Sequence, residues 1–188
     1  MQKQTSLVLM LFLVFVHHTT AWADEYQDTI QVFKNAGESG DFFGKSYAYA
    51  VFPTVGKGGI GIGGAHGKGL VYVAGKAVGK TSTTQVTLGF QLGGQAYSMI
   101  VFLEDQRAFN EFTSGNFEFG AQANAVAITA GLSAAATTGG SSAGASGGKN
   151  DATTVGEFYK GMATFTVAKG GLMYEASIGG AKFSYDPF

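Results

Sequence analysis

The stretch from Val71 to Thr84, VYVAGKAVGKTSTT, places glycine, lysine and hydroxyl residues in an order close to that of a phosphate-binding loop. Such a loop needs a glycine, four further residues and then Gly-Lys-Ser/Thr, because its backbone N–H groups and its lysine surround the phosphates. Residues 79–81 supply the Gly-Lys-Thr end, but the first position falls on Ala74, and Gly75 comes one residue late. The spacing fails, so we expect no nucleotide to bind here.

A second glycine pattern, GIGIGG from Gly59 to Gly64, matches the dinucleotide fingerprint G-x-G-x-x-G. That fingerprint works only between a strand and a helix, with an acidic residue about 20 positions further on. Here it is followed by Gly67, Gly69 and the apolar run LVYV, and no Asp or Glu occurs between residues 42 and 103. The pattern therefore indicates strand and turn glycines.

Candidates for catalysis and metal binding are few. Glu104 and Asp105 are adjacent carboxylates, but at the start of a predicted helix they are typical of capping and of charge complementary to the helix dipole. His66 stands alone in a glycine-rich stretch, where a structural or solvent-exposed role is favoured over that of a general base. The chain has no cysteine, which excludes disulfides and thiol chemistry, and zinc would need a site built almost wholly from carboxylates. We expect no enzyme, no metal site and no cofactor.

The N-terminus has the pattern of a secretory signal peptide. Lys3 precedes an apolar core at residues 7–16, and Ala21-Trp22-Ala23 forms a small-x-small cleavage site. Residues 1–23 are therefore predicted to be removed, which leaves residues 24–188 as a single domain. We expect an exported protein that is periplasmic or associated with the outer membrane, or secreted.

Composition and periodicity predict a mainly β fold. Glycine accounts for 30 of 188 residues, against a usual share of about 7%, yet 45% of the chain is hydrophobic, which indicates a folded domain. Gly-Gly pairs that separate apolar segments, at 58–59, 63–64, 93–94, 170–171 and 179–180, are interpreted as the turns and strand ends of a meander.

Alternating apolar residues predict the strands. Residues 86–92 and 96–103 alternate around Gly93-Gly94, as in a tight hairpin, and residues 172–178 and 183–185 continue the pattern. We expect a β-rich α+β domain: an antiparallel, closed or nearly closed β-barrel-like sheet with one or two short helices.

Two segments follow helical periodicity instead. Tyr26, Ile30 and Phe33 are spaced for one helix face ahead of Gly37, and residues 105–113 form a second candidate helix. The alanine-rich run 121–136 is interpreted as a strand. A Gly/Ser/Ala-rich mobile loop is predicted near residues 133–153, because it cannot bury enough apolar surface to offset its ordering entropy.

The charges are distributed unevenly along the chain. Residues 24–41 contain five acidic residues and one lysine, whereas residues 42–103 contain no acid and five lysines: Lys45, Lys57, Lys68, Lys76 and Lys80. Lysines near an anionic membrane contribute about 1 kcal/mol each, so this segment suits an anionic headgroup; lysines that merely solvate hairpin ends are the alternative. Nucleic acid is not expected as a partner, because the chain has a single arginine, Arg107.

Four blocks of sequence, taken in order, resemble the SYLF domain. They are AYAVFPTVGKGGIGIGGAHGKGLVY, FQLGGQAYSMIVFL, FEFGAQANAVAITAG and KGGLMYEASIGGAKFSYD, and together they extend roughly from Lys45 to Asp186. The resemblance implies a lipid-binding module without known catalysis, whose eukaryotic members bind phosphoinositides and, in fungi, actin filaments. Actin is not an expected partner in an exported protein.

The resemblance also implies site residues. The basic and glycine positions after the Phe-Pro turn correspond to Lys57, Gly58, Gly59, Gly61, Gly64, Gly67 and Gly69, and a later element corresponds to Lys169, Gly170 and Gly171. The chain departs from the family in having Lys-Thr-Ser-Thr at 80–83 where Trp-Ser is usual, and in an enlarged loop around residues 139–148.

These observations lead to one functional hypothesis. The protein is expected to bind anionic phospholipid of the bacterial envelope peripherally, with Lys57, Lys68, Lys76 and Lys80 supplying charge, glycines exposing backbone N–H groups, and Phe52 and Tyr72 at the interface. The alternative is a small integral outer-membrane β-barrel or a structural envelope protein. Against the barrel, the positions that alternate back from Phe188 are Asp186, Ser184 and Lys182 rather than apolar residues.

Overall fold

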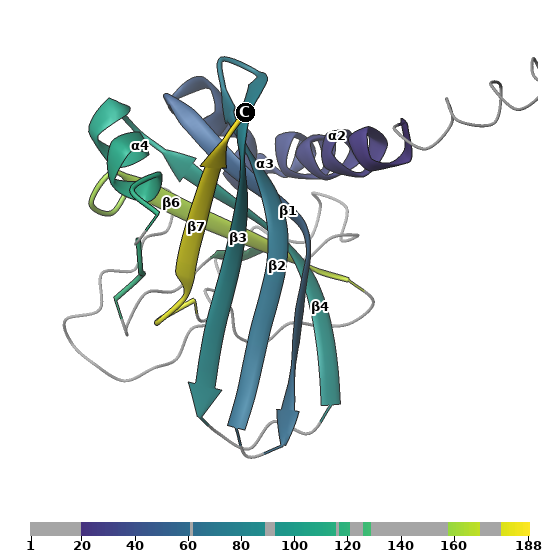
Figure 1. Ribbon diagram of the computed structural model, residues 1–188. Coiled ribbons are helices and arrows are strands. Elements are labelled where there is room, and N and C mark those ends of the chain that lie inside the picture. The colour runs from purple at the N-terminus through teal and green to yellow at the C-terminus, as the bar shows by residue number, and fades with distance from the viewer. Residues whose placement is uncertain are drawn as a thin grey trace, which may run out of the picture.

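The computed structural model describes seven stretches of the chain: residues 20–60, 62–88, 93–115, 117–120, 126–128, 158–169 and 178–188. The predicted signal core, the predicted mobile loop near 133–153 and the predicted strand at 172–177 lie outside these stretches. Within them the chain is mainly β, as predicted (Figure 1).

One seven-stranded sheet organises the domain. Its strands are β1 (Ala48–Ile60), β2 (Ile62–Val73), β3 (Lys76–Leu88), β4 (Gly93–Leu103), β5 (Val126–Ile128), β6 (Met162–Lys169) and β7 (Lys182–Pro187). Their order across the sheet is β5-β6-β4-β1-β2-β3-β7, and every pair is antiparallel except β5 with β6.

The sheet is not closed, so the expectation of a closed or nearly closed barrel was too strong. The strands β5 and β7 are the two ends of the described sheet order and do not pair with each other. Residues 117–119 extend the β7 end, where Phe119 N donates to Ala181 O at 3.0 Å and Phe183 N donates to Phe117 O at 2.9 Å.

The expected hairpin at Gly93-Gly94 is wrong. Strand β4 pairs with β1 and β6 rather than with β3, and Gly93 and Gly94 lie within β4, opposite Gly59 and Gly58 of β1. Alternation along a strand shows which residues share a face, but it does not reveal which strand lies alongside.

The segment that resembles a phosphate-binding loop is a β-hairpin. Strands β2 and β3 are joined by Ala74 and Gly75, which both have positive φ, 49° and 77°. Two central residues with positive φ are typical of the type I′ turn, whose twist matches that of the flanking strands. The prediction of strand and turn glycines is confirmed for this stretch.

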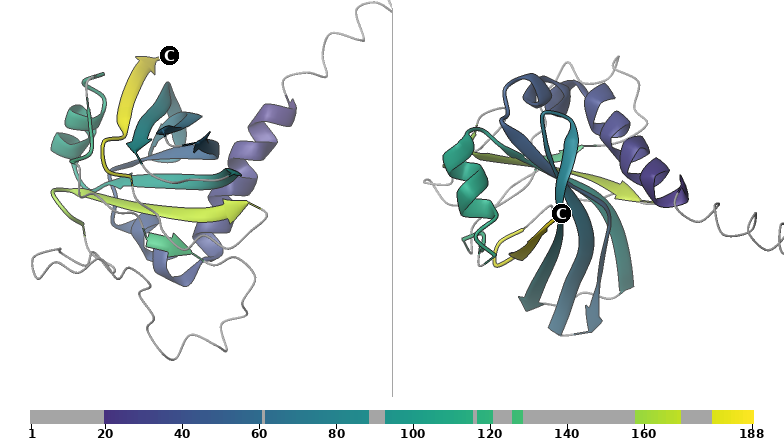
Figure 2. Two further views of the ribbon diagram at one scale, coloured as in Figure 1. Left: turned by 90° about the horizontal axis from the view of Figure 1, so that it is seen from below. Right: turned by 45° about the horizontal axis from the view of Figure 1, so that its top comes forward.

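Helices cover the upper part of the sheet on both faces (Figure 2). The helix α2 (Thr20–Asn35) is followed by α3 (Gly37–Gly40) and the 3₁₀ turn η1 (Asp41–Gly44), and α4 (Gln106–Phe112) follows β4. Both predicted helices are confirmed: Tyr26, Ile30 and Phe33 of α2 are buried, and Asp105 caps α4 by accepting a hydrogen bond from Ala108 N at 2.7 Å.

Two hydrophobic clusters lie on opposite faces of the sheet. One joins α2 and η1 to Val51, Tyr72, Ile100, Phe102 and Phe165. The other joins α4 and the turn before β7 to Phe52, Val55, Met99, Val101 and Phe183. The central strand β1 is therefore buried on both sides over its first half.

A bulge at Pro53 interrupts β1. The register shifts between Val51 and Thr54 against β2, and between Phe52 and Val55 against β4, so one extra residue stands in β1. Proline has no N–H to give to the ladder, which is why it is tolerated in a central strand only at such a bulge. Ser98 Oγ donates a hydrogen bond to Pro53 O at 2.7 Å, which gives the carbonyl oxygen at the bulge a hydrogen-bond partner.

The turn yields a first prediction. Replacement Ala74→Asn should raise the free energy of unfolding by about 0.5–1 kcal/mol, because asparagine tolerates positive φ better than alanine and suits the first position of a type I′ turn. Urea denaturation measures the change. Ala77→Asn, at an exposed strand position with ordinary φ, is the matched control and should be neutral or destabilising.

Two of the buried tyrosines, Tyr72 and Tyr97, yield a second prediction. Burial raises the pKa of Tyr97 to about 12, and burial, with Tyr49 and Tyr26 nearby, raises that of Tyr72 to about 12. Unfolded tyrosine loses its proton near pH 10, so the unfolded state binds fewer protons than the folded state between pH 10 and about 12. The free energy of unfolding should therefore be intact below pH 10 and fall as the pH rises through this window, by about 2–3 kcal/mol for each tyrosine.

Urea denaturation across this pH window, with tyrosinate absorbance as a second readout, tests the point. Tyr97→Phe should lose less stability than the unmodified chain on going from neutral to alkaline pH. Tyr159→Phe, at a position 55% exposed, is the control and should lose as much as the unmodified chain. An equal alkaline loss in Tyr97→Phe and the unmodified chain would show that Tyr97 does not contribute to this transition.

Candidate functional site

Beyond the bulge, β1–β4 continue together as a projecting half of the sheet (Figure 1). We call residues 54–60, 62–68, 82–88 and 93–98 the distal half. Residues directly opposite each other in a sheet share a face, so the register assigns each side chain to one of two faces. We call the face of Thr54 and Gly56 the outer face and that of Val55 the inner face.

The inner face of the distal half is largely buried. Val55, Gly67 and Thr83 occupy one row, and Ala65 and Gln85 occupy the next. Gln85 Nε2 donates to Gly179 O at 2.8 Å, which ties the turn before β7 to this face.

Lys57 belongs to the inner face. It pairs with Ala65 of β2 and Gln95 of β4, and its side chain is half-buried. The predicted site lysines therefore do not lie on one face, because Lys68, opposite Ser82 and Thr54, belongs to the outer face.

The outer face carries a band of cations and hydroxyl groups, which we call the cation band. Two adjacent rows across the strands form it; their residues are Lys182, Thr84 and His66 in one row, and Ser184, Ser82, Lys68 and Thr54 in the other. His66 Nδ1 lies 3.1 Å from Thr84 Oγ1, and the hydroxyl groups of Ser82 and Ser184 are 2.7 Å apart.

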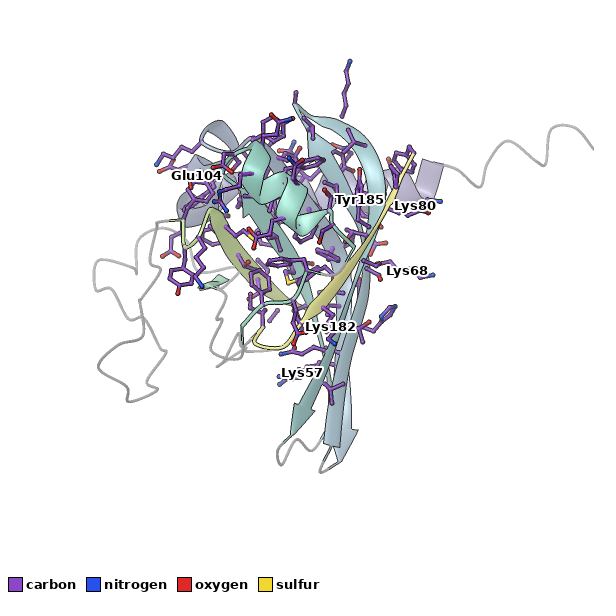
Figure 3. All side chains as sticks on the ribbon, turned by 60° about the vertical axis from the view of Figure 1, so that its left-hand side comes forward. Lys57, Lys68, Lys80, Glu104, Lys182 and Tyr185 are labelled. Atoms are coloured by element: carbon purple, nitrogen blue, oxygen red, sulfur yellow. The ribbon has the colours of Figure 1, made fainter. Side chains whose placement is uncertain are left out.

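The cations of this region differ in their partners. Lys182 Nζ lies 3.4 Å from Glu118 Oε2; the Lys182 side chain is mostly exposed and that of Glu118 about half exposed. Within the described residues, Lys68 has no carboxylate at ion-pair distance, and its side chain projects from the strands into solvent (Figure 3). Lys68 is thus an exposed cation of the outer face that is available to an external anion.

Lys169 has a structural contact. Its Nζ donates to Thr54 Oγ1 at 2.6 Å and lies 3.5 Å from Glu25 Oε1, and Thr54 Oγ1 is itself 3.2 Å from Glu25. The three groups link β6 and β1 to the first part of α2. The structure therefore gives this predicted site residue an intramolecular partner at the border of the cation band.

Lys76 and Lys80 lie toward the other end of β3. Lys76 is exposed and follows the Ala74-Gly75 turn directly. Lys80 is on the outer face opposite Asp186, with its Nζ 5.9 Å from the centre of the Phe188 ring. Figure 3 shows Lys57 nearest the free end of the strands, with Lys68 and Lys80 farther up.

Below the cation band, glycines form a surface without side chains. Gly64, Gly58 and Gly94 are side by side on β2, β1 and β4, all exposed, and Val86 of β3 completes this row with 70% of its surface exposed. We call these four residues the glycine row. A Cβ on any of the three glycines would meet no atom closer than 3.6 Å, and none of them has positive φ.

At the glycines nearer the bulge, close packing is the reason that a side chain is not accommodated. A Cβ at Gly67 would lie 2.7 Å from Val55 Cγ2, and one at Gly69 would lie 2.7 Å from Phe52 Cδ1. Both residues are buried on the inner face, where they let side chains of β1 pack against β2. Gly59 is half-buried near the end of β1, and Gly61 and Gly170 lie outside the described residues.

One part of the predicted interface is wrong. Phe52 has none of its surface exposed and Tyr72 has 4%, so both belong to the hydrophobic clusters and neither is available to a membrane. The prediction failed because the aromatic types suit an interface and a core equally well.

Three outer-face residues went unrecognised as site candidates in the sequence. Lys182 joins the cation band only because β7 pairs with β3, which no local pattern reveals. His66 follows the alternation of β2 and Val86 that of β3, but local sequence does not reveal which face of these strands is left exposed. The absence of acids from 42 to 103 was the one available signal for this surface.

The described residues contain no group of three or more His, Asp or Glu side chains placed to hold a metal ion. Among the helices in the described ranges, none combines the length and the apolar character needed to cross a membrane.

The two kinds of glycine yield a third prediction. Gly67→Ala should lower the free energy of unfolding by about 1–3 kcal/mol, because the added methyl group must displace β1 or its side chains. Gly58→Ala and Gly64→Ala should be neutral or raise it by up to about 1 kcal/mol, since alanine has less backbone entropy to lose. Urea denaturation of the three variants measures both effects, and an equal loss at all three positions would contradict the division.

The comparisons with known proteins agree with the resemblance drawn from the sequence. No curated protein matches the chain. A family profile described as Ysc84, "Las17-binding protein actin regulator", matches residues 84–187, which is more than half of the chain and runs from the distal part of β3 through β7. Three of the four resembling blocks lie within or largely within that range, while the block that contains β1 and β2 precedes it. The chain therefore belongs to the Ysc84 family of SYLF domains.

Proposed function

We propose that the protein binds anionic phospholipid at a membrane surface through the cation band of the outer face, as an exported protein of the bacterial envelope. Membership of the SYLF family is consistent with lipid binding. The observation that carries the proposal is the cation band, where the exposed side chains of Lys68, Lys182 and His66 lie in the same rows as serine and threonine hydroxyl groups.

Charge supports an anionic partner. The segment 42–103, which supplies β1–β4, has five lysines and no acid. Three carboxylates lie beside the cation band in the described residues: Glu118 and Glu25, each beside a lysine, and Asp186, which is opposite Lys80 in the next row. Exposed ion pairs of this kind contribute little, so the lysines in them can turn to phosphate groups at small cost.

The hydroxyl groups support a phosphate partner. Thr84, Ser82 and Ser184 are on the same face as Lys68, and their hydroxyl groups bond mainly to one another or to His66. A hydroxyl donor beside an ammonium group is a usual pair of contacts for a phosphate oxygen. The proposal therefore assigns charge to the lysines and short-range hydrogen bonding to the serine and threonine residues.

Binding to actin is the second candidate, since the family description names actin regulation. The predicted signal peptide argues against this partner, because actin is cytoplasmic. A direct comparison is simple, since sedimentation with actin filaments uses the same readout as sedimentation with vesicles.

The proposal predicts salt-sensitive binding that depends on Lys68. Residues 24–188 should sediment with vesicles of phosphatidylcholine and phosphatidylglycerol at low salt, less at high salt, and not with phosphatidylcholine alone. Lys68→Glu should weaken binding roughly thirtyfold, because it removes one attraction and adds one repulsion of about 1 kcal/mol each.

Lys76→Glu is the matched control. Lys76 is also exposed and lies on the neighbouring strand, and its substitution changes the net charge by the same amount. It lies at the end of β3 that is opposite to the free end of the sheet. Its variant should bind within about twofold of the unmodified chain. Equal weakening in both variants would mean that binding follows net charge rather than the cation band. If the protein sediments with actin filaments but not with vesicles, actin binding replaces lipid binding as the proposed function.

A further inference from the structure

We propose that the free end of the sheet inserts shallowly into the hydrocarbon of the membrane, with Val86 and the glycine row below the headgroups while the cation band stays among the phosphates. This inference rests on the proposed function and adds the orientation of the bound protein and the part that enters the bilayer.

The first argument is the order of residue types along the strands. From the cation band toward the free end, the outer face passes from Thr84 and His66 to Val86 and Gly64. Polarity therefore falls in one direction along the same strands, which is the arrangement that a membrane interface requires.

The second argument is the match of lengths. Successive rows on one face are two residues apart, or about 7 Å, so the row of His66 lies about 7 Å from the glycine row. The headgroup region on each side of a bilayer is about 5–8 Å thick. A protein that holds its cations at the phosphates thus places Val86 at the edge of the hydrocarbon.

The third argument is Val86 itself. A valine with 70% of its surface exposed, beside three exposed glycines, leaves apolar surface in water with no described element covering it. None of the three glycines is required by backbone conformation or packing. Their effect is to keep polar side chains away from the outer face at this end of the sheet, where Val86 is the exposed side chain of the row.

The fourth argument concerns backbone groups, which must be hydrogen-bonded before they enter hydrocarbon. Gly58 of β1 is paired on both sides, with Gly64 of β2 and with Gly94 of β4, so the middle of the glycine row meets this condition. Strand β7 stops pairing with β3 at Thr84, and β6 pairs with β4 only from Ala96. The partial pairing at the sides favours shallow insertion over a deep one.

Two variants that add the same charge to neighbouring rows test the inference. Val86→Lys and Thr84→Lys are both exposed outer-face positions on β3, two residues apart. If binding were purely electrostatic, both lysines would strengthen it. Insertion predicts opposite signs: Thr84→Lys strengthens binding to phosphatidylglycerol vesicles a few fold, whereas Val86→Lys weakens it about tenfold, because an ammonium group replaces an apolar contact at the hydrocarbon edge.

The depth of Val86 in the membrane can be measured directly, because the chain has no cysteine and a single introduced cysteine can be labelled specifically. Val86→Cys labelled with an environment-sensitive fluorophore should shift to shorter wavelength on anionic vesicles and be quenched by spin labels on the acyl chains. Ala77→Cys, exposed near the opposite end of β3, carries the same label as the control and should not respond.

The outcomes separate the two proposals. Salt-sensitive vesicle binding with a responsive Val86 label and opposite effects of the two lysines supports both. Binding in which the Val86 label stays in water and Val86→Lys binds more tightly overturns the insertion while the proposed function stands. Absence of vesicle binding by the unmodified chain overturns both.

Discussion

The two-sided burial of β1 is the constraint on which the accessible surface depends. Val51 faces α2 and Phe52 faces α4, so the first half of the strand needs a helix on each side. The first turns of α2 reach the sheet at Thr54, where Glu25 and Lys169 meet, directly after the bulge at Pro53. Beyond that point the outer face has no described helix against it, and a side chain there is either solvated or bound by something else.

Glycine serves two opposed purposes in this sheet, and only the structure separates them. At Gly67 and Gly69 the missing Cβ allows β1 side chains to approach, which stabilises the core. At Gly58 and Gly64 nothing occupies the space, so glycine there weakens the strand and gives no packing in return. Because packing does not explain these glycines, we infer that their role is in the exposed surface that they form. That surface lies beside the cation band.

Local pattern was enough to predict the elements but not their arrangement. The spacing of Tyr26, Ile30 and Phe33 identified α2, and Asp105 was recognised as a cap, because both features depend on neighbours in sequence. The pairing of β4 with β1 joins residues that are 34 (Gly59 and Gly93) to 55 (Ala48 and Leu103) positions apart, so the Gly93-Gly94 pair was mistaken for a turn. The bulge had a similar effect: strict alternation would put Phe52 and Lys57 on opposite faces, and the extra residue at Pro53 puts both on the inner face.

The form of the cation band also indicates what kind of selectivity the proposed binding can have. Lys68, His66 and Lys182 are exposed side chains on a sheet surface, not buried donors fixed around one ligand. Exposed lysines contribute additively and weakly and are screened by salt, whereas discrimination between headgroups requires desolvated polar groups that one ligand satisfies and another leaves unpaired. A surface of this kind responds to the density of negative charge more than to the identity of the headgroup. Its orientation on the membrane then depends on the order of rows along the strands, from the two rows of the cation band to the glycine row, because charge alone would allow the sheet to lie at any angle.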